Sequence, residues 1–101
     1  MHVGICRLSL ELPGNQHLKG KRQVSRSLIG KVRHRFNVSI AEVDDNNLWQ
    51  RLTLGICCVS NDLSHANSVI SHVVDFIESV RGDLYVLDYD VEMISGIYFR
   101  C

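Results

Sequence analysis

Two kinds of hydrophobic periodicity alternate along the chain, and their order limits the folds that it can adopt. Apolar residues recur at helical spacing over residues 18–36 and 63–80, and at strand spacing in the segments around them. The period-two segments predict strands over residues 2–12, 37–43, 48–59 and 84–94. A polar turn at residues 44–47 joins the second and third strands into a hairpin. The predicted element order is therefore β-α-β-β-α-β.

This order is that of a split βαβ unit, the ferredoxin-like α+β arrangement. Right-handed crossovers would place both helices on one face of a four-stranded antiparallel sheet with strand order 4-1-3-2. With 101 residues, 46% of them hydrophobic, the chain can close one core without metal ions or disulfides. We therefore predict a single domain over residues 1–101, with a core at residues 2–94 and a tail at residues 95–101.

The cysteines form neither a metal-binding nor a disulfide pattern. None belongs to a C-x-x-C pair, and no histidine lies at zinc-ligand spacing from them. We interpret them as reduced thiols that pack as small hydrophobic residues, and we expect no cofactor and no metal site. The cysteines are Cys6, Cys57, Cys58 and Cys101.

No signal peptide precedes the first strand, and no apolar run approaches the roughly 20 residues of a membrane span. These two features predict a cytoplasmic protein without a membrane partner.

The first predicted helix is strongly basic. Residues 18–36 contain seven of the eleven Lys and Arg residues and no Asp or Glu. A cationic helix flank suits an anionic partner such as RNA phosphate, although a basic face that contacts only solvent has the same pattern. Our leading hypothesis is that the chain binds structured RNA, such as ribosomal RNA or a ribosomal particle, through this flank. Gly30 in the helix interior predicts a close approach by another backbone. The predicted contact residues are Lys19, Lys21, Arg22, Arg26 and Arg33.

The sheet face without helices suggests a second hypothesis. It would be a partly apolar surface of small residues, which a monomer would expose to water, so we predict a homodimer through this face or through the edge of the second strand. Coverage by the tail is the alternative. RNA binding on this face is disfavoured, because stacking of bases needs several exposed aromatic residues and the face carries one. The predicted interface residues are Ala41, Val43, Trp49, Thr53 and Cys57.

The sequence contains no complete catalytic motif. Residues 14–22 are comparable to a phosphate-binding P-loop, but the glycines are one residue too far apart and Arg22 replaces the magnesium-binding hydroxyl residue. Asp88, Asp90 and Glu92 alternate on one strand face, where we expect them to pair with Arg7 rather than to act as acid–base groups. We therefore predict a non-enzymatic binding module. A small-ligand-binding regulator or an enzyme is an alternative that rests on fold analogy alone.

Two segments carry a resemblance to a known family. These are HLKGKR at residues 17–22, which resembles the family's S-L-K-x-K-R entry to the first helix, and NVSIAEV at residues 37–43. On these segments and on most of the remaining chain, the sequence resembles the bacterial YlxP-like family, also called domain of unknown function family 503. His17 stands where the family usually has Ser, and Gly20 where it has an acidic residue. The resemblance implies a ferredoxin-like fold and no established activity, and the family's gene neighbourhood implies a ribosome-linked role.

Overall fold

The computed structural model describes residues 1–96, and its element order is the predicted β-α-β-β-α-β. Predicted and observed bounds differ by at most three residues, with the largest difference at the start of the third strand, where the turn continues to residue 50. Residues 97–101 of the predicted tail lie outside the described part. The elements are β1 (His2–Glu11), α1 (Leu18–Arg35), β2 (Ser39–Asp44), β3 (Arg51–Ser60), α2 (Leu63–Val80) and β4 (Tyr85–Ser95).

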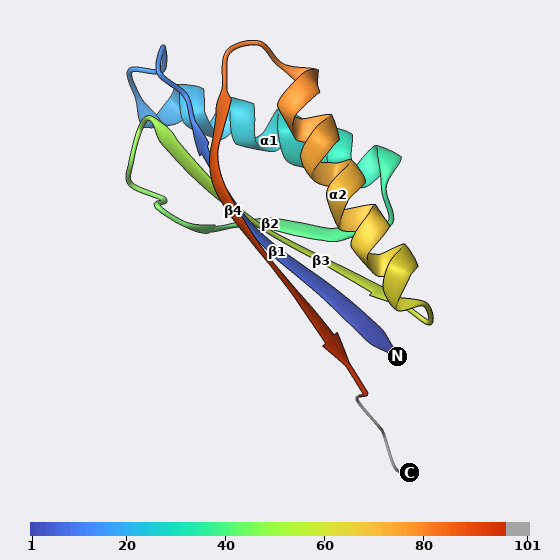
Figure 1. Cartoon of the computed structure of the whole chain (residues 1–101). Helices are drawn as coiled ribbons and strands as arrows, with labels where there is room; N and C mark the ends of the chain where they lie inside the picture. The colour runs from blue at the N-terminus through green and yellow to red at the C-terminus, as the bar shows by residue number, and fades with distance from the viewer. Residues whose placement is uncertain (97–101) are drawn as a thin grey trace.

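The four strands form one antiparallel sheet in the order β2-β3-β1-β4, which is the predicted order read from the opposite edge. β1 is therefore a central strand, and Leu8 at its middle pairs with Leu54 of β3 and Tyr89 of β4. Both helices lie on the same face of the sheet (Figure 1). This confirms an α+β fold and leaves the second sheet face without a helix.

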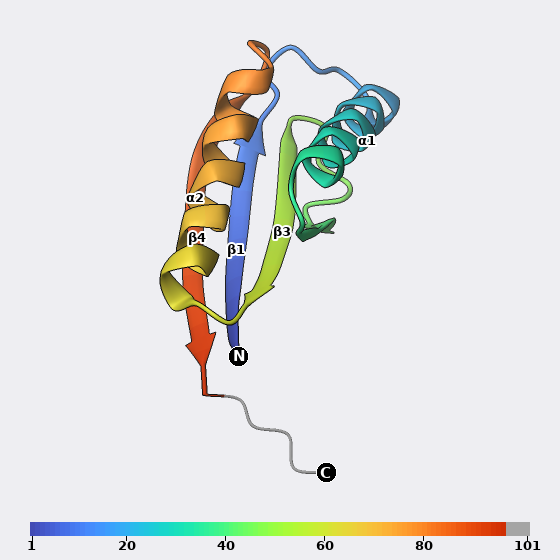
Figure 2. The same cartoon turned by 90° about the vertical axis from the view of Figure 1, so that its right-hand side faces the viewer.

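Alternation along β1 and β3 builds the core. Cys6, Leu8 and Leu10 are fully buried, and they point towards the helices together with their partners on β3. α2 packs over β1 and β3, whereas α1 packs mainly over β2 (Figure 2). The two helices therefore cover different halves of the sheet. The α2 residues that complete the core are Ala66, Ile70, Val73, Val74 and Ile77.

β4 departs from the strict period-two pattern predicted for residues 84–94. The pairing of β1 with β4 shifts register between Ser9 and Leu10, so that Val86 becomes the partner of Leu10. A β-bulge of this kind reverses the alternation beyond it. Val86 consequently packs against the core, as does Met93 on the other side of the bulge, whereas most of the other apolar side chains of β4 are exposed. The exposed residues are Tyr85, Leu87, Tyr89 and Val91.

The cysteines within residues 1–96 are free thiols. Cys6 and Cys58 are buried in the core, and burial, together with the nearby charge of Asp90, raises the pKa of the Cys6 thiol to about 11. Since the thiolate is the reactive form of cysteine, Cys6 acts as a small hydrophobic residue at neutral pH. Among the described residues no group of three His, Cys, Asp or Glu side chains is placed to share a metal ion. None of the described helices is both long and apolar enough to span a membrane.

Candidate nucleic-acid interface

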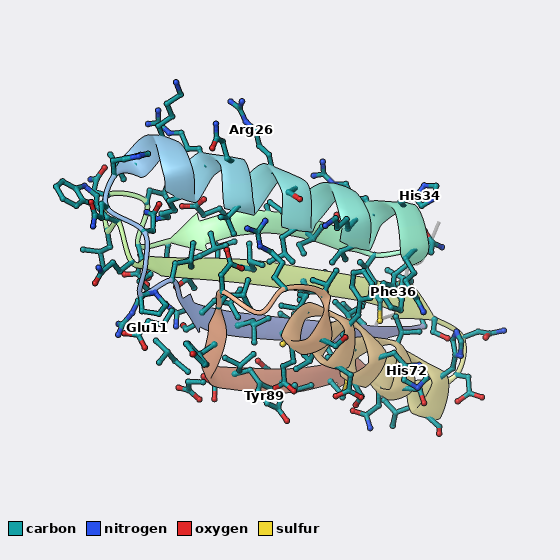
Figure 3. All side chains as sticks on the ribbon, turned by 90° about the horizontal axis from the view of Figure 1, so that it is seen from above. Glu11, Arg26, His34, Phe36, His72 and Tyr89 are labelled. Atoms are coloured by element: carbon teal, nitrogen blue, oxygen red, sulfur yellow. The ribbon has the colours of Figure 1, made fainter. Side chains whose placement is uncertain are left out.

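Three of the predicted contact residues form a row on the exposed side of α1. Lys19, Arg22 and Arg26 follow one another at spacings of three and four residues, which places them on one helix flank over a length of about 10 Å. All three are exposed, and none belongs to an ion pair within the described residues. Arg26 lies on the far side of α1 from His72 of α2 (Figure 3). The row therefore presents unpaired positive charge to solvent, and we call it the α1 basic row.

The start of α1 is held in place by local hydrogen bonds. His17 is the N-cap residue, and its Nδ1 accepts a hydrogen bond of 2.9 Å from the backbone N–H of Gly20. The imidazole thus takes the role that a Ser hydroxyl usually has at this position. The amide of Asn15 donates to the carbonyl oxygens of both His17 and Trp49. These bonds join the helix start to the loop before β3, so the α1 basic row has a defined position on the fold.

The prediction that Lys21 contacts RNA is wrong, because this residue is only 1% exposed. Its ammonium lies 3.2 Å from Oε1 of Glu42 on β2 and donates a hydrogen bond to the backbone oxygen of Asp45. Lys21 follows Lys19 by two residues, or about 200° around the helix, so it points to the sheet rather than to solvent. The same wheel that aligns the other cations could have identified Lys21 as the exception.

Arg33 is exposed, but its guanidinium already has a partner in the fold. It donates a hydrogen bond of 3.0 Å to the backbone oxygen of Ile40. Ile40 belongs to β2, an edge strand whose outward carbonyl groups would otherwise be open to another chain. Arg33 therefore helps to protect this edge, and we do not include it in the α1 basic row.

Lys31, His34 and Arg35 are exposed side chains with basic groups that the predicted set did not contain. Arg35 lies over the ring of Phe76 on α2, with 5.0 Å between its guanidinium carbon and the ring centroid. Of the three, Arg35 is therefore the residue with a direct contact to α2. The basic composition of residues 18–36 was the only signal for them in the sequence.

The open sheet face carries an ion pair that differs from the predicted one. Asp90 is the register partner of Arg7 on β4, but the guanidinium of Arg7 reaches the carboxylate of Asp44 on β2 instead, at 2.8 Å. The backbone N–H of Asp45 and the Arg7 guanidinium both stabilise this carboxylate, so they lower the pKa of Asp44. The carboxylates of β4 therefore stay exposed at the other edge of the sheet. They are Asp88, Asp90 and Glu92.

Three of the five predicted interface residues, Ala41, Val43 and Cys57, lie together on the open sheet face. Ala41 and Val43 are exposed on β2 and Cys57 is half-buried on β3. Thr53 is fully buried, and its hydroxyl donates a 2.6 Å hydrogen bond to Asp45, so it is not available for an interface. Trp49 is not part of a strand but lies in the loop between β2 and β3. The pairing of the strands also brings a second set of apolar side chains together on the open face. The alternation of residues along each strand could have predicted this set. Its members are Val3, Ile5, Cys57, Val59 and Ile94.

Comparison with known proteins places the chain in a family without a known function. The pattern of the family described as "Protein of unknown function (DUF503)" matches residues 3–91. The chain is also similar to the uncharacterized protein YlxP of Bacillus subtilis, with 37% identity over 62 residues that make up 61% of this chain and 67% of that protein. The family match over residues 3–91 covers both helices and, apart from His2, both central strands. The chain therefore belongs to the DUF503 family.

Proposed function

We propose that the chain is a cytoplasmic, non-enzymatic, ferredoxin-like module that binds structured RNA, such as that of a ribosomal particle, through the α1 basic row. The observation that carries the proposal is that Lys19, Arg22 and Arg26 are exposed on one flank without an ion pair among the described residues. A fold of zero formal net charge gains little from a diffuse attraction, so such binding depends on this local cluster.

The distribution of acidic groups limits RNA to the helix side of the molecule. Asp88, Asp90 and Glu92 are exposed on β4, at the edge of the sheet farthest from β2. These carboxylates would repel a phosphate chain on the open sheet face. The α1 basic row has no aromatic side chain within it, so its contacts would be to phosphate oxygens and would carry little sequence preference.

The first prediction concerns RNA affinity. Binding to ribosomal particles or total RNA is expected to weaken about 40- to 130-fold between roughly 50 and 300 mM salt, if each of three contacts releases a counterion. The double substitution Arg22→Glu/Arg26→Glu should abolish binding at the lower salt concentration. Co-sedimentation and fluorescence anisotropy measure both effects.

The matched control for this experiment is Arg51→Glu/Arg81→Glu, which changes the net charge by the same amount on other elements. This control should retain most of the affinity, because the row is intact. Normal RNA binding by the Arg22→Glu/Arg26→Glu protein would refute the proposal, as would an equal loss of affinity in both double variants.

A second candidate function is self-association through the open sheet face. Val3 pairs with Val59 and Ile94, and Ile5 with Cys57, so apolar side chains from three strands adjoin at one end of this face. Val59 is 66% exposed and Ile5 is 38% exposed. A contiguous exposed apolar patch is typical of an interaction site, and a two-fold dimer would cover it with its own copy. This surface lies opposite the helices, so it would leave the α1 basic row accessible.

The second prediction is that Val59→Glu converts a dimer into a monomer, because two carboxylates would be buried at the interface. Light scattering at several protein concentrations measures the mass. Leu63→Glu is a suitable control, since Leu63 is an exposed apolar residue at the start of α2 on the helix side of the fold. A monomeric parent protein, or a Val59→Glu protein that remains dimeric, would exclude this interface.

A further inference from the structure

A groove of about 720 Å³ crosses the exposed side of α1 at Gly30 and reaches Phe76 on α2. Its size falls within the range of small-ligand sites. On the helical wheel, Arg26 lies on one side of Gly30, and Lys31 and Arg35 lie towards α2 on the other. We call this hollow the Gly30 groove. Its principal lining residues are Arg26, Gly30, Lys31, His34, Arg35 and Phe76.

Gly30 has no packing role inside the described molecule. A Cβ atom at this position would find nothing within 4 Å, so the predicted close approach by another backbone is wrong. Glycine is less favourable than alanine in the interior of a helix, because it loses more backbone entropy. The described contacts therefore give no reason for a glycine here, and its visible effect is to leave the floor of the groove open.

The walls of the groove are cationic on both sides of Gly30. Arg26, Lys31 and Arg35 line it together with His34, and no Asp or Glu is among the lining residues. Because like charges have been gathered around one hollow without a carboxylate, an anionic group would be stabilised there. Planar guanidinium groups bind phosphate oxygens in a bidentate manner, which makes phosphate a well-suited anion.

The end of the groove nearest α2 is formed by the aromatic ring of Phe76. The ring of Phe76 makes an edge-to-face contact with Phe36, with 5.6 Å between the ring centroids. Arg35 from α1 lies over the same Phe76 ring, so a guanidinium and an aromatic ring adjoin at this end. A ligand with a flat ring beside its phosphate could therefore place the phosphate among the cations and the ring against Phe76. A nucleotide has these two parts in one unit.

We propose that the Gly30 groove binds one unpaired nucleotide of an RNA strand whose neighbouring phosphates lie on the α1 basic row. This inference rests on the proposed function, and it adds a site and a ligand to it. Arg26 joins the two surfaces, because it belongs to the row and also lines the groove. Unpaired nucleotides are the parts of RNA that proteins hold by stacking against aromatic and Arg side chains. The phosphate contacts of the α1 basic row carry no sequence preference. The Gly30 groove would consequently make the protein prefer RNA loops, bulges or strand ends.

The test compares two RNA hairpins that differ only in one unpaired nucleotide at a bulge. The wild-type protein should bind the bulged hairpin at least about fivefold more tightly than the fully paired one, the lower limit for one stacked base. Gly30→Leu should remove this preference by filling the floor of the groove while it leaves affinity for the paired hairpin within about twofold, since the row is unchanged. Fluorescence anisotropy measures both affinities.

Two further variants keep the test independent of folding effects. Gly30→Ala adds one methyl group where there is room, so it should raise the melting temperature and keep most of the preference for the bulge. Lys31→Glu reverses a charge on the opposite wall of the groove, so this variant should also lose the preference for the bulged hairpin. A melting temperature of Gly30→Leu at or above the wild-type value shows that any loss is local.

Several outcomes would overturn the inference. One is equal affinity of the wild-type protein for the two hairpins, and another is a Gly30→Leu protein that keeps the preference. A polyglutamate peptide that binds the wild-type protein more tightly than the bulged RNA, and not the Gly30→Leu protein, would assign the groove to an acidic protein. Failure of the proposed function is distinct, because then the wild-type protein would bind neither hairpin in a salt-dependent manner.

Discussion

Lys21→Ala is expected to lower the free energy of unfolding by about 3 kcal/mol, because it breaks a largely buried ion pair from one side. The side chain of Lys21 is 2% exposed and that of its partner Glu42 is 21% exposed. Without the ammonium, the Glu42 carboxylate keeps only neutral side-chain donors, the Ser25 hydroxyl and the Asn46 amide. The carbonyl of Asp45 also loses its hydrogen bond from Lys21. Urea denaturation followed by circular dichroism measures the loss.

Two controls separate the ion pair from general effects of charge. Lys19→Ala removes an exposed cation two residues earlier and should change stability by no more than about 0.5 kcal/mol. Lys21→Met/Glu42→Leu removes both charges and should recover much of the stability, because apolar replacement of a whole pair is often neutral. The double variant should also bind RNA normally, since Lys21 does not reach solvent. Equal effects of Lys19→Ala and Lys21→Ala would contradict this assignment.

The order of the elements could be predicted from the sequence because periodicity is a local property. β1 shows this most clearly, since its alternation from Cys6 to Leu10 identifies the buried face without knowledge of its neighbours. The handedness of crossovers then leaves few sheet orders, and the observed order is among them. The predicted pattern of β4 failed at Val86, where a bulge shifts the register. Such a bulge depends on how two strands pair, which the sequence of one strand does not show.

The candidate site could be predicted in part for the same reason. The spacing of Lys19, Arg22 and Arg26 places them on one flank in any helix, whatever the helix packs against. The burial of Lys21 was within reach of the helical wheel, but its partners come from β2 and the following turn, which only the fold brings together. The Gly30 groove depends on the position of α2 relative to α1, and no local pattern reports that distance.

Gly4 sets how closely α2 approaches the sheet. Gly4→Val is expected to lower the free energy of unfolding by about 2 kcal/mol or more, because the larger side chain overpacks the core. Gly4 is buried on β1, and an added Cβ would lie 3.1 Å from Cγ1 of Ile70 and 3.3 Å from Sγ of Cys58. The further methyl groups of valine would overlap these atoms unless α2 moved away. Gly4→Ala should be nearly neutral, because the side chains around one methyl group can shift by a few tenths of an ångström. Chemical denaturation measures the series.

A compensating substitution tests whether the closeness of α2 is the cause. Ile70→Ala alone should destabilise the protein by about 2–5 kcal/mol, as a large-to-small change in the core does. In Gly4→Val/Ile70→Ala the new methyl groups would occupy the vacated space, so the double variant should be more stable than the sum predicts by about 1 kcal/mol. Leu28→Ala deletes a buried side chain under α1, away from Gly4, and its effect should add to that of Gly4→Val. Additive effects in both pairs would mean that strand conformation, and not contact with α2, requires glycine at this position.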